Sequence, residues 1–174
     1  MIDAEIILES ERLILRQHVM ADRDAFCAME MDPDVRRFVG GYPRPRKEAE
    51  QRFVRLLEPI ANGLGMWATV LKSEGSYVGR CGIFPHFRAD SSVIPNEAAL
   101  GLYIATCHWN RGLATEAGRT LVEYGFSQLA FTKIVTTVEV GNDASAHVVR
   151  KLGFELRSTE TGPRSFYHFV LDRP

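Results

Sequence analysis

The stretch of residues 100–129 constrains the fold of this chain more than any other part of the sequence. It begins with an apolar run at residues 100–104, typical of a buried strand, and after a turn at residues 111–114 it continues with the periodicity of a helix. Small or apolar residues then recur every three or four positions along one helical face, at Ala114, Ala117, Gly118, Leu121, Val122, Gly125, Phe126 and Leu129. Because glycine is a poor helix former, Gly118 and Gly125 predict that this face packs closely against a sheet.

The turn before this helix has the composition of an anion-binding site. The first N–H groups of a helix lack intrahelical partners, and the helix dipole adds about half a positive charge there. Gly112 lets the backbone approach a phosphate, Ala114 keeps a nearby position small, and Thr115 can help to satisfy the helix start. The same residues also suit an ordinary strand-to-helix turn, so the local pattern leaves both interpretations open.

Two motifs give the chain a resemblance to the GNAT superfamily of acyl-CoA N-acyltransferases. Residues 109–114 (WNRGLA), followed by TEA, look like the family's pyrophosphate loop, Gln/Arg-x-x-Gly-x-Gly/Ala, from which Trp109 departs at the first position. This variant resembles the branch that contains the ribosomal-protein N-terminal (alanine/serine) acetyltransferases. Residues 142–145 (NDAS) and 150–154 (RKLGF) resemble the second family motif. The resemblance covers nearly the whole chain and implies one acyl-CoA N-acyltransferase domain over residues 1–174.

The fold class that the resemblance implies is α/β (α+β), with a mixed, mostly antiparallel, twisted sheet of about seven strands flanked by about four helices. In that fold acyl-CoA enters where the sheet is splayed between its fourth and fifth strands, here residues 98–104 and 133–140. Hydrophobic patterning predicts the same order of elements. It places strands at residues 11–17, 66–71, 77–84, 98–104, 133–140, 154–158 and 165–171, and helices at residues 22–31, 47–57, 114–129 and 143–152. It also predicts one or two further helical turns at residues 34–39, a helix end or kink at Pro59, and a loop over residues 85–96.

Composition restricts the class of protein. With 174 residues, of which 45% are hydrophobic and 25% charged, the chain has the size and composition of one globular domain. A formal net charge of -1 argues against a nucleic-acid partner, and the sequence has no apolar run of membrane-spanning length and no signal-peptide pattern. Cys27, Cys81 and Cys107 are too few and too scattered for a disulfide framework, which favours a reducing cytoplasm. His86 and His108 do not complete a zinc-site spacing with these cysteines, so no metal is expected.

The resemblance implies acetyl-CoA as co-substrate and assigns the residues that bind it. They are Tyr103, Ile104, Trp109, Asn110, Arg111, Gly112, Leu113, Ala114, Thr115, Asn142 and Ser145. Direct acyl transfer also needs a hydrogen-bond donor for the oxyanion that develops on the thioester. Family members supply it from a β-bulge in the fourth strand, which here implies N–H groups from about Leu102 to Ile104, with Leu102 the catalytic candidate, and Gly101 is consistent with such a bulge.

Ser145 is the candidate acid for the leaving thiolate. Its spacing from Val148, Val149 and Leu152 places it on the inward stripe of a helix. A serine at such a position usually bonds its own backbone, whereas the resemblance implies that it faces the CoA sulfur and protonates it. Asn142 suits a helix N-cap, and the resemblance adds a hydrogen bond to the pantetheine arm, so both roles can hold.

The base for the attacking amine is the least defined part of the site. The branch often has a glutamate two residues before the glycine of the fourth strand, and here that position is Ala99. Glu97 lies two residues earlier on the same side of the strand and could take the proton through a water molecule. The alternatives are that Glu97 is a solvated carboxylate at the strand entry, or that the amine loses its proton to solution.

These features predict an N-acetyltransferase that moves an acetyl group from acetyl-CoA to a primary amine by direct attack in a ternary complex. The acceptor stays open between a peptide or protein N-terminus and a small amine, with a candidate aromatic pocket near Phe38, Tyr42, Trp67, Phe84 and Phe87. The alternative function, which Ala99 favours, is a catalytically silent CoA-binding or protein-interaction module with the same fold. We expect a cytoplasmic monomer or homodimer with no membrane or nucleic-acid partner.

Overall fold

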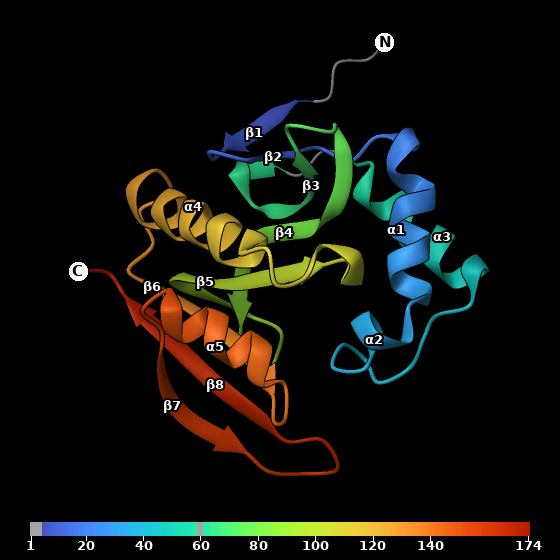
Figure 1. The fold of residues 1–174 in the computed structure, drawn as a ribbon. Helices are drawn as coiled ribbons and strands as arrows, with labels where there is room; N and C mark the ends of the chain where they lie inside the picture. Colours follow the sequence, from blue (N-terminus) through green and yellow to red (C-terminus); the bar gives the residue numbers. More distant parts are fainter. Residues whose placement is uncertain (1–4, 59–60) are drawn as a thin grey trace.

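A computed structural model describes residues 5–58 and 61–174, and these residues form one sheet of eight strands in the order β1-β2-β3-β4-β5-β6-β8-β7 (Figure 1). Neighbouring strands are antiparallel except β5 and β6, which run parallel. The strands are β1 (Ile6–Glu9), β2 (Leu13–Arg16), β3 (Gly65–Leu71), β4 (Ser76–Phe87), β5 (Val93–Ile104), β6 (Lys133–Glu139), β7 (Glu155–Glu160) and β8 (Phe166–Asp172).

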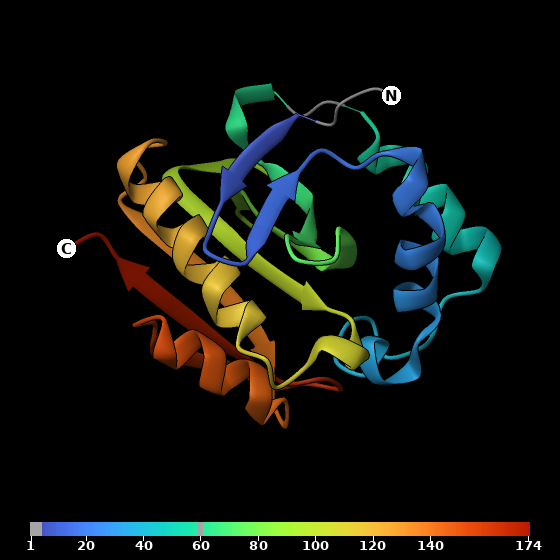
Figure 2. The same cartoon turned by 45° about the horizontal axis from the view of Figure 1, so that its top comes forward.

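Within the same described residues, five α-helices cover the two faces of the sheet. They are α1 (Arg23–Met31), α2 (Pro33–Arg36), α3 (Arg46–Leu56), α4 (Leu113–Ser127) and α5 (Asp143–Lys151). Helices α4 and α5 lie together on one side, while α1, α2 and α3 gather on the other (Figure 2). No helix in the described part of the chain is both long and apolar enough to span a membrane.

The predicted fold class is confirmed, since the sheet is mixed, mostly antiparallel and flanked by helices. Patterning does not predict β1, because its four residues (IILE) lack the two-residue alternation of a half-buried strand. Helix α2 forms within the predicted extra turns, and the side chain of Asp32 caps it by accepting a hydrogen bond from the backbone N–H of Asp34 at 2.8 Å. The break predicted at Pro59 lies outside the described residues.

The loop predicted over residues 85–96 is wrong, because β4 continues to Phe87 and pairs there with Val93 at the start of β5. Proline lacks the N–H that a strand ladder needs. Pro85 is nevertheless tolerated, because β3 begins at Gly65, which pairs with Ile83. Among the described residues, β3 therefore does not extend beside Pro85. The pairing of β4 with β5 is also irregular between Pro85 and Phe87.

The sheet is splayed between β5 and β6, as the resemblance implies. These two strands pair only at residues 97–99 and 133–135. The hydroxyl of Thr136 donates a buried hydrogen bond of 3.0 Å to the carbonyl oxygen of Leu100. Beyond this point β5 stays with β4 and β6 stays with β8, so the two halves of the sheet part.

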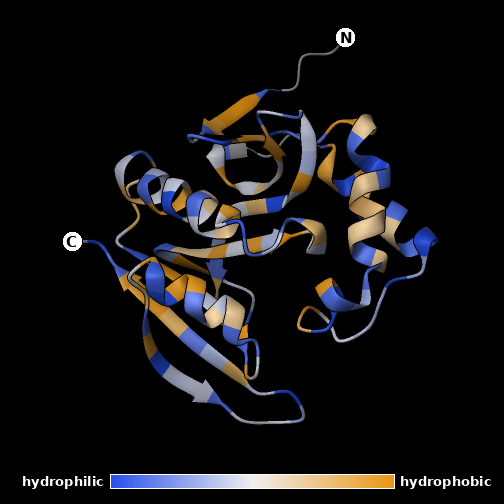
Figure 3. Ribbon diagram, viewed as in Figure 1, coloured by the Kyte–Doolittle hydropathy of each residue, from blue (hydrophilic) through white to orange (hydrophobic). Residues whose placement is uncertain are grey.

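The main hydrophobic core lies between the sheet and α4. A Cβ atom at Gly118 would lie 2.5 Å from Leu152 Cδ1, and one at Gly125 would lie 2.7 Å from Ile83 Cδ1. The close packing predicted from these two glycines is therefore confirmed. The colouring of Figure 3 shows hydrophobic residues recurring along the strands of the sheet, whereas β7 is largely hydrophilic and is exposed along its whole length. Fully buried core residues include Leu13, Leu15, Ile83, Leu113, Leu121, Ile134 and Phe169.

Gly82 in β4 provides a test of the sheet packing. A Cβ atom there would lie 1.8 Å from the carbonyl oxygen of Gly65, a backbone atom that cannot rotate away. We expect Gly82→Ala to push β3 from β4 and to lower the free energy of unfolding by about 1–3 kcal/mol, as overpacking does. Chemical denaturation measures this loss. Gly162→Ala is the matched control, because the nearest atom to its Cβ would be the carbonyl oxygen of Arg164 at 3.5 Å. Equal unfolding midpoints for the two variants would contradict the account.

Candidate active site

A cavity of about 800 Å³ opens where β5 and β6 part, between the N-terminal ends of α4 and α5. It brings together nearly all of the residues that the resemblance assigns to acetyl-CoA. Arg111 is not among the lining residues, and its side chain instead lies 2.9 Å from His108 Nδ1. The predicted residues that do line the cavity are Leu102, Tyr103, Ile104, Trp109, Asn110, Gly112, Leu113, Ala114, Thr115, Asn142 and Ser145.

The start of α4 faces this cavity with free backbone donors. Gly112, the N-cap residue, has φ +77°, a left-handed conformation that favours glycine. No side chain caps this end of the helix, so Thr115 does not have the capping role expected of it. Since Glu116 N is the first helical N–H to bond within the turn, at 3.0 Å from Gly112 O, the N–H groups of residues 113–115 lack intrahelical partners and can receive an anion.

The backbone of β5 supplies a further donor. Ala105 N donates to Val78 O at 2.9 Å, and the register between β5 and β4 is regular from Ala98 to Ile104. The predicted bulge near Gly101 is therefore wrong. Because an antiparallel strand directs its N–H groups alternately to either side, the N–H of Leu102 points away from β4, where pairing with β6 has already ended. The parting of the strands thus exposes this donor to the cavity without a bulge.

The first turn of α5 forms the opposite wall. Asn142 Oδ1 accepts a hydrogen bond of 3.2 Å from Ser145 N, which confirms the predicted N-cap. Capping uses only the amide oxygen, so the amide nitrogen of Asn142 can still donate to a ligand. Within the described residues Ser145 Oγ makes no hydrogen bond to its own backbone, and Ser145 lines the cavity.

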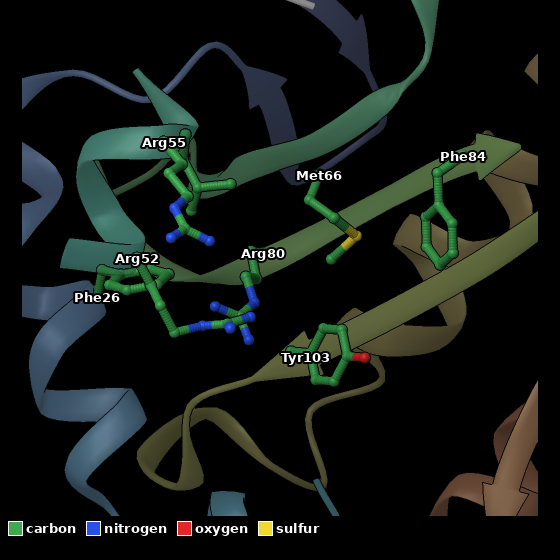
Figure 4. Close-up of a pocket in the computed structure, with 8 residues that line it drawn as sticks. Phe26, Arg52, Arg55, Met66, Arg80, Phe84 and Tyr103 are labelled. Carbon is green, nitrogen blue, oxygen red and sulfur yellow. The ribbon is translucent and has the colours of Figure 1, made fainter. Parts of the chain in front are cut away.

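A smaller cavity, about 340 Å³ in volume, lies on the other face of β5 (Figure 4). Gly101 and Tyr103 face this side, because a Cβ at Gly101 would meet Met66, Phe84 and Tyr103 side chains. Tyr103 lines both cavities, so this residue of β5 borders both spaces. The lining residues are Phe26, Arg52, Arg55, Leu56, Met66, Arg80, Phe84 and Tyr103.

The aromatic acceptor pocket predicted from the sequence does not form as a unit. Only Phe84 lines the smaller cavity, while Phe38 lines the larger one. Trp67 is buried on the α4 side of the sheet, where its ring centroid lies 6.2 Å from that of Tyr124. Tyr42 and Phe87 are exposed. Strand alternation sends Trp67 and Phe84 to opposite faces of the sheet, and Phe38 and Tyr42 lie between α2 and α3, so aromatic content alone does not reveal the arrangement.

Comparison with known proteins supplies the family. Residues 12–155 match the acetyltransferase (GNAT) domain family. The chain belongs to this family. It is 31% identical over 160 residues to the uncharacterized protein YkkB of Bacillus subtilis (strain 168), covering 90% of each chain. Over 74 residues it is 30% identical to the putative ribosomal N-acetyltransferase YdaF of the same bacterium, covering 42% of this chain and 39% of that protein.

A solved structure shows the same fold. The spermidine N-acetyltransferase from Vibrio cholerae, in complex with CoA and spermine, has a TM-score of 0.73 and 16% sequence identity, covering 92% of this chain and 95% of that one. The resemblance to the GNAT superfamily is thus confirmed. GNAT proteins use acetyl-CoA, and this chain is an acetyl-CoA-dependent acyltransferase of that family.

Glu116 fixes the position of the helix start in this GNAT domain, a role that local patterns do not reveal. Its carboxylate accepts hydrogen bonds from Ser10 Oγ at 2.6 Å, from Arg12 N at 2.7 Å and from Arg12 Nε at 2.6 Å. Burial raises the pKa of Glu116, but these donors lower it more, so the pKa lies below its usual range. Arg12 also donates to the carbonyl oxygen of Arg111 at 3.0 Å. The turn between β1 and β2 therefore holds the loop before α4 in place.

Glu97, the predicted base, lines neither cavity. Its Oε2 atom lies 2.9 Å from His86 Nδ1, and its Oε1 atom lies 3.0 Å from Lys133 Nζ. Burial raises the pKa of Glu97, but the hydrogen bonds from Lys133 and His86 lower it more. By strand alternation Glu97 shares the sheet face of Tyr103 and the smaller cavity.

The left-handed backbone at Gly112 generates a prediction about the helix start. We expect Gly112→Ala to weaken acetyl-CoA binding by about tenfold, because a side chain in this conformation costs roughly 1–2 kcal/mol and the strain displaces the N–H groups. Isothermal titration calorimetry measures the affinity. Gly75→Ala is the matched control, since Gly75 has φ +63° in the turn between β3 and β4, away from both cavities. Unchanged affinity in a folded Gly112→Ala protein would remove this loop from the site.

Proposed function

We propose that this chain transfers an acetyl group from acetyl-CoA to a primary amine by direct attack within a ternary complex. One observation carries the proposal: the two cavities lie on opposite faces of β5, and Tyr103 lines both of them. Direct attack requires both substrates to reach one point at the same time, and a shared wall with two openings provides that arrangement.

The residues of the larger cavity fit acetyl-CoA. The three free N–H groups at the start of α4 suit a pyrophosphate, and Gly112 keeps the approach to them open. Leu102 and Ile104 offer apolar contacts along β5, while Asn142 offers an amide to the pantetheine arm. Trp109 Nε1 donates to Ile104 O at 2.7 Å, which ties the loop to the end of β5.

Two groups on the walls of this cavity would support the chemistry. The N–H of Leu102 would donate to the thioester carbonyl oxygen as negative charge develops there. Ser145 Oγ would give its proton to the departing sulfur while the amine nitrogen forms its bond to the acetyl carbon. The amine must also lose a proton, and that proton needs an acceptor on the side of the smaller cavity.

For this acceptor we assign His86, oriented by Glu97 and reached through water, since neither side chain lines the smaller cavity. A carboxylate with a lowered pKa is a weak base, and both oxygens of Glu97 already have partners. The contact of His86 Nδ1 with Glu97 Oε2 leaves Nε2 of the imidazole to accept a proton. Glu97 is then a positioning residue and not the base itself.

The second candidate function, a silent CoA-binding module, rests on Ala99 at the position where the branch often has its glutamate. Thiol release from acetyl-CoA over a panel of primary amines separates the two functions. We expect turnover with at least one amine. Binding of acetyl-CoA without turnover on any amine would favour the silent module.

Ser145 gives a prediction about the acid. We expect Ser145→Ala to lower kcat by about 10²–10⁴-fold with little change in acetyl-CoA affinity, because the variant cannot protonate the leaving sulfur. Steady-state kinetics and calorimetry measure the two quantities. Ser127→Ala is the control, since Ser127 Oγ bonds Glu123 O at the far end of α4. A kcat near that of the unmodified enzyme would reduce Ser145 to a positioning role.

Glu97 gives a prediction about pH. We expect Glu97→Gln to lower kcat/KM most at pH values below the pKa of the amine, because there few amines are already neutral and the base matters most. At high pH the variant should approach the unmodified enzyme. Glu160→Gln is the control, since Glu160 pairs with His168 on β7 and β8 at 3.2 Å. A loss that is equal at every pH would show that Glu97 only holds the structure, and no loss would show that the amine is deprotonated by solution.

A further inference from the structure

The smaller cavity is strongly basic. Three of its eight lining residues are arginines, and none of the described residues that line it is acidic. Figure 4 shows the guanidinium groups of Arg52, Arg55 and Arg80 gathered at one end of the cavity, with Met66, Phe84 and Tyr103 toward the other end. One end of this space therefore suits an anion, and the other suits carbon chains.

Arg80 forms the rigid part of the basic end. It lies on β4 with 7% of its surface exposed, and its guanidinium carbon is 5.0 Å from the ring centroid of Phe26 and 4.8 Å from that of Tyr103. Its Nη2 atom lies 2.6 Å from Glu30 Oε1. A guanidinium held on three sides keeps its direction, which is what a preorganised binding group requires.

Glu30 does not neutralise this group of arginines. It is fully buried on α1, and its Oε2 atom lies 2.8 Å from Arg44 Nε, 3.4 Å from Arg36 Nη1 and 3.9 Å from Arg52 Nε. One carboxylate thus pairs with four guanidinium groups when Arg80 is included, and among the described residues only Arg44 of these four has a second carboxylate partner, Glu48.

The other two arginines that line the cavity lie on α3. Arg52 and Arg55 are three residues apart on this helix and so share one face. Within the described residues Arg55 forms no ion pair. Burial and then the positive charge of Arg44 lower the pKa of Arg52, which means that its charged form is destabilised. An anion added beside it would stabilise that charged form. A polyamine in this cavity would meet like charges instead.

We propose that the amine acceptor carries an anionic group, a carboxylate or a phosphate, which Arg52, Arg55 and Arg80 bind while the amine reaches toward Tyr103. The inference rests on the proposed function and names its substrate class: a small amino acid or phosphorylated amine of a size suited to a cavity of about 340 Å³. Arginine is suited to both anions because its planar fork binds carboxylate and phosphate through two parallel hydrogen bonds.

Matched amines test the proposal. Lysine and cadaverine differ by a carboxylate, and phosphoethanolamine and ethanolamine differ by a phosphate, so the two pairs also distinguish the two anions. We expect kcat/KM for thiol release to be about 10- to 100-fold higher for the anionic member of at least one pair, as a charge-assisted hydrogen bond provides. Spermidine is expected to be a poor acceptor. Higher kcat/KM for cadaverine, ethanolamine or spermidine than for both anionic amines would overturn the proposal.

Variants of α3 connect the preference to the arginines. Arg52→Gln and Arg55→Gln should raise KM for the anionic amine by about tenfold without raising KM for the partner that lacks the anionic group, and Arg55→Lys should restore part of the loss. Arg55→Glu should shift the preference toward cadaverine. Arg119→Gln is the control, because Arg119 is an exposed residue of α4 that lines neither cavity. Unchanged discrimination in all three charge-removing or charge-reversing variants would contradict the proposal, provided that their melting temperatures match the control.

Calorimetry separates this inference from the proposed function. Lysine and phosphoethanolamine are titrated into the protein in the presence of CoA, which cannot react. Binding that is lost in Arg55→Gln supports the anion site even if no amine is acetylated, in which case only the proposed function fails. Turnover of amines without any preference for an anionic group leaves the proposed function intact and overturns the inference. No binding of either anionic amine also overturns it.

Discussion

The active-site architecture depends on the short length over which β5 and β6 pair. They pair at residues 97–99 and 133–135, and Thr136 adds one side-chain bond to Leu100. Because a parallel pair here is so short, each strand follows its own antiparallel partner, β5 with β4 and β6 with β8. The N–H of Leu102 is left without a strand beside it, and the resulting opening receives the first turns of α4 and α5. A longer parallel ladder would consume the donors and close the larger cavity.

Two carboxylates, the half-buried Glu116 and the fully buried Glu30, organise the positive charge on either side of β5 and line neither cavity. Glu116 is bound by Ser10 and Arg12, so it anchors the start of α4 while its charge is compensated and does not repel an anion at the free N–H groups. Glu30 is surrounded by guanidinium groups and holds Arg80 toward the smaller cavity. Backbone donors thus provide the positive end of one cavity and side chains provide that of the other.

The parts of the site that follow from local patterns could be predicted from the sequence, and the parts that join distant segments could not. Residues 100–129 predict the strand, the turn and the close packing of Gly118 and Gly125, because each depends on neighbours within a few positions. The anchoring of Glu116 by Ser10 spans 106 residues, and the ion pair of Glu97 with Lys133 spans 36. The smaller cavity brings arginines of α3 and β4 together. The predicted aromatic pocket does not form, because alternation directs Trp67 and Phe84 to opposite faces of the sheet and two of the other rings lie outside the strands. Only the fold brings such residues together.

Tyr103 forms part of the wall of both cavities. Its ring lies against the guanidinium of Arg80, at 4.8 Å, and its position on β5 is next to the exposed N–H of Leu102. Since Arg80 is itself fixed by Glu30 and Phe26, the ring has a rigid support on the acceptor side. An anionic acceptor bound at Arg80 would therefore be positioned relative to the same strand that holds the thioester. Direct attack gains most from such fixed placement, because the rate depends on holding both reactants in the correct geometry. The short pairing of β5 with β6 and the arginines around Glu30 thus both serve to position a reactant against β5.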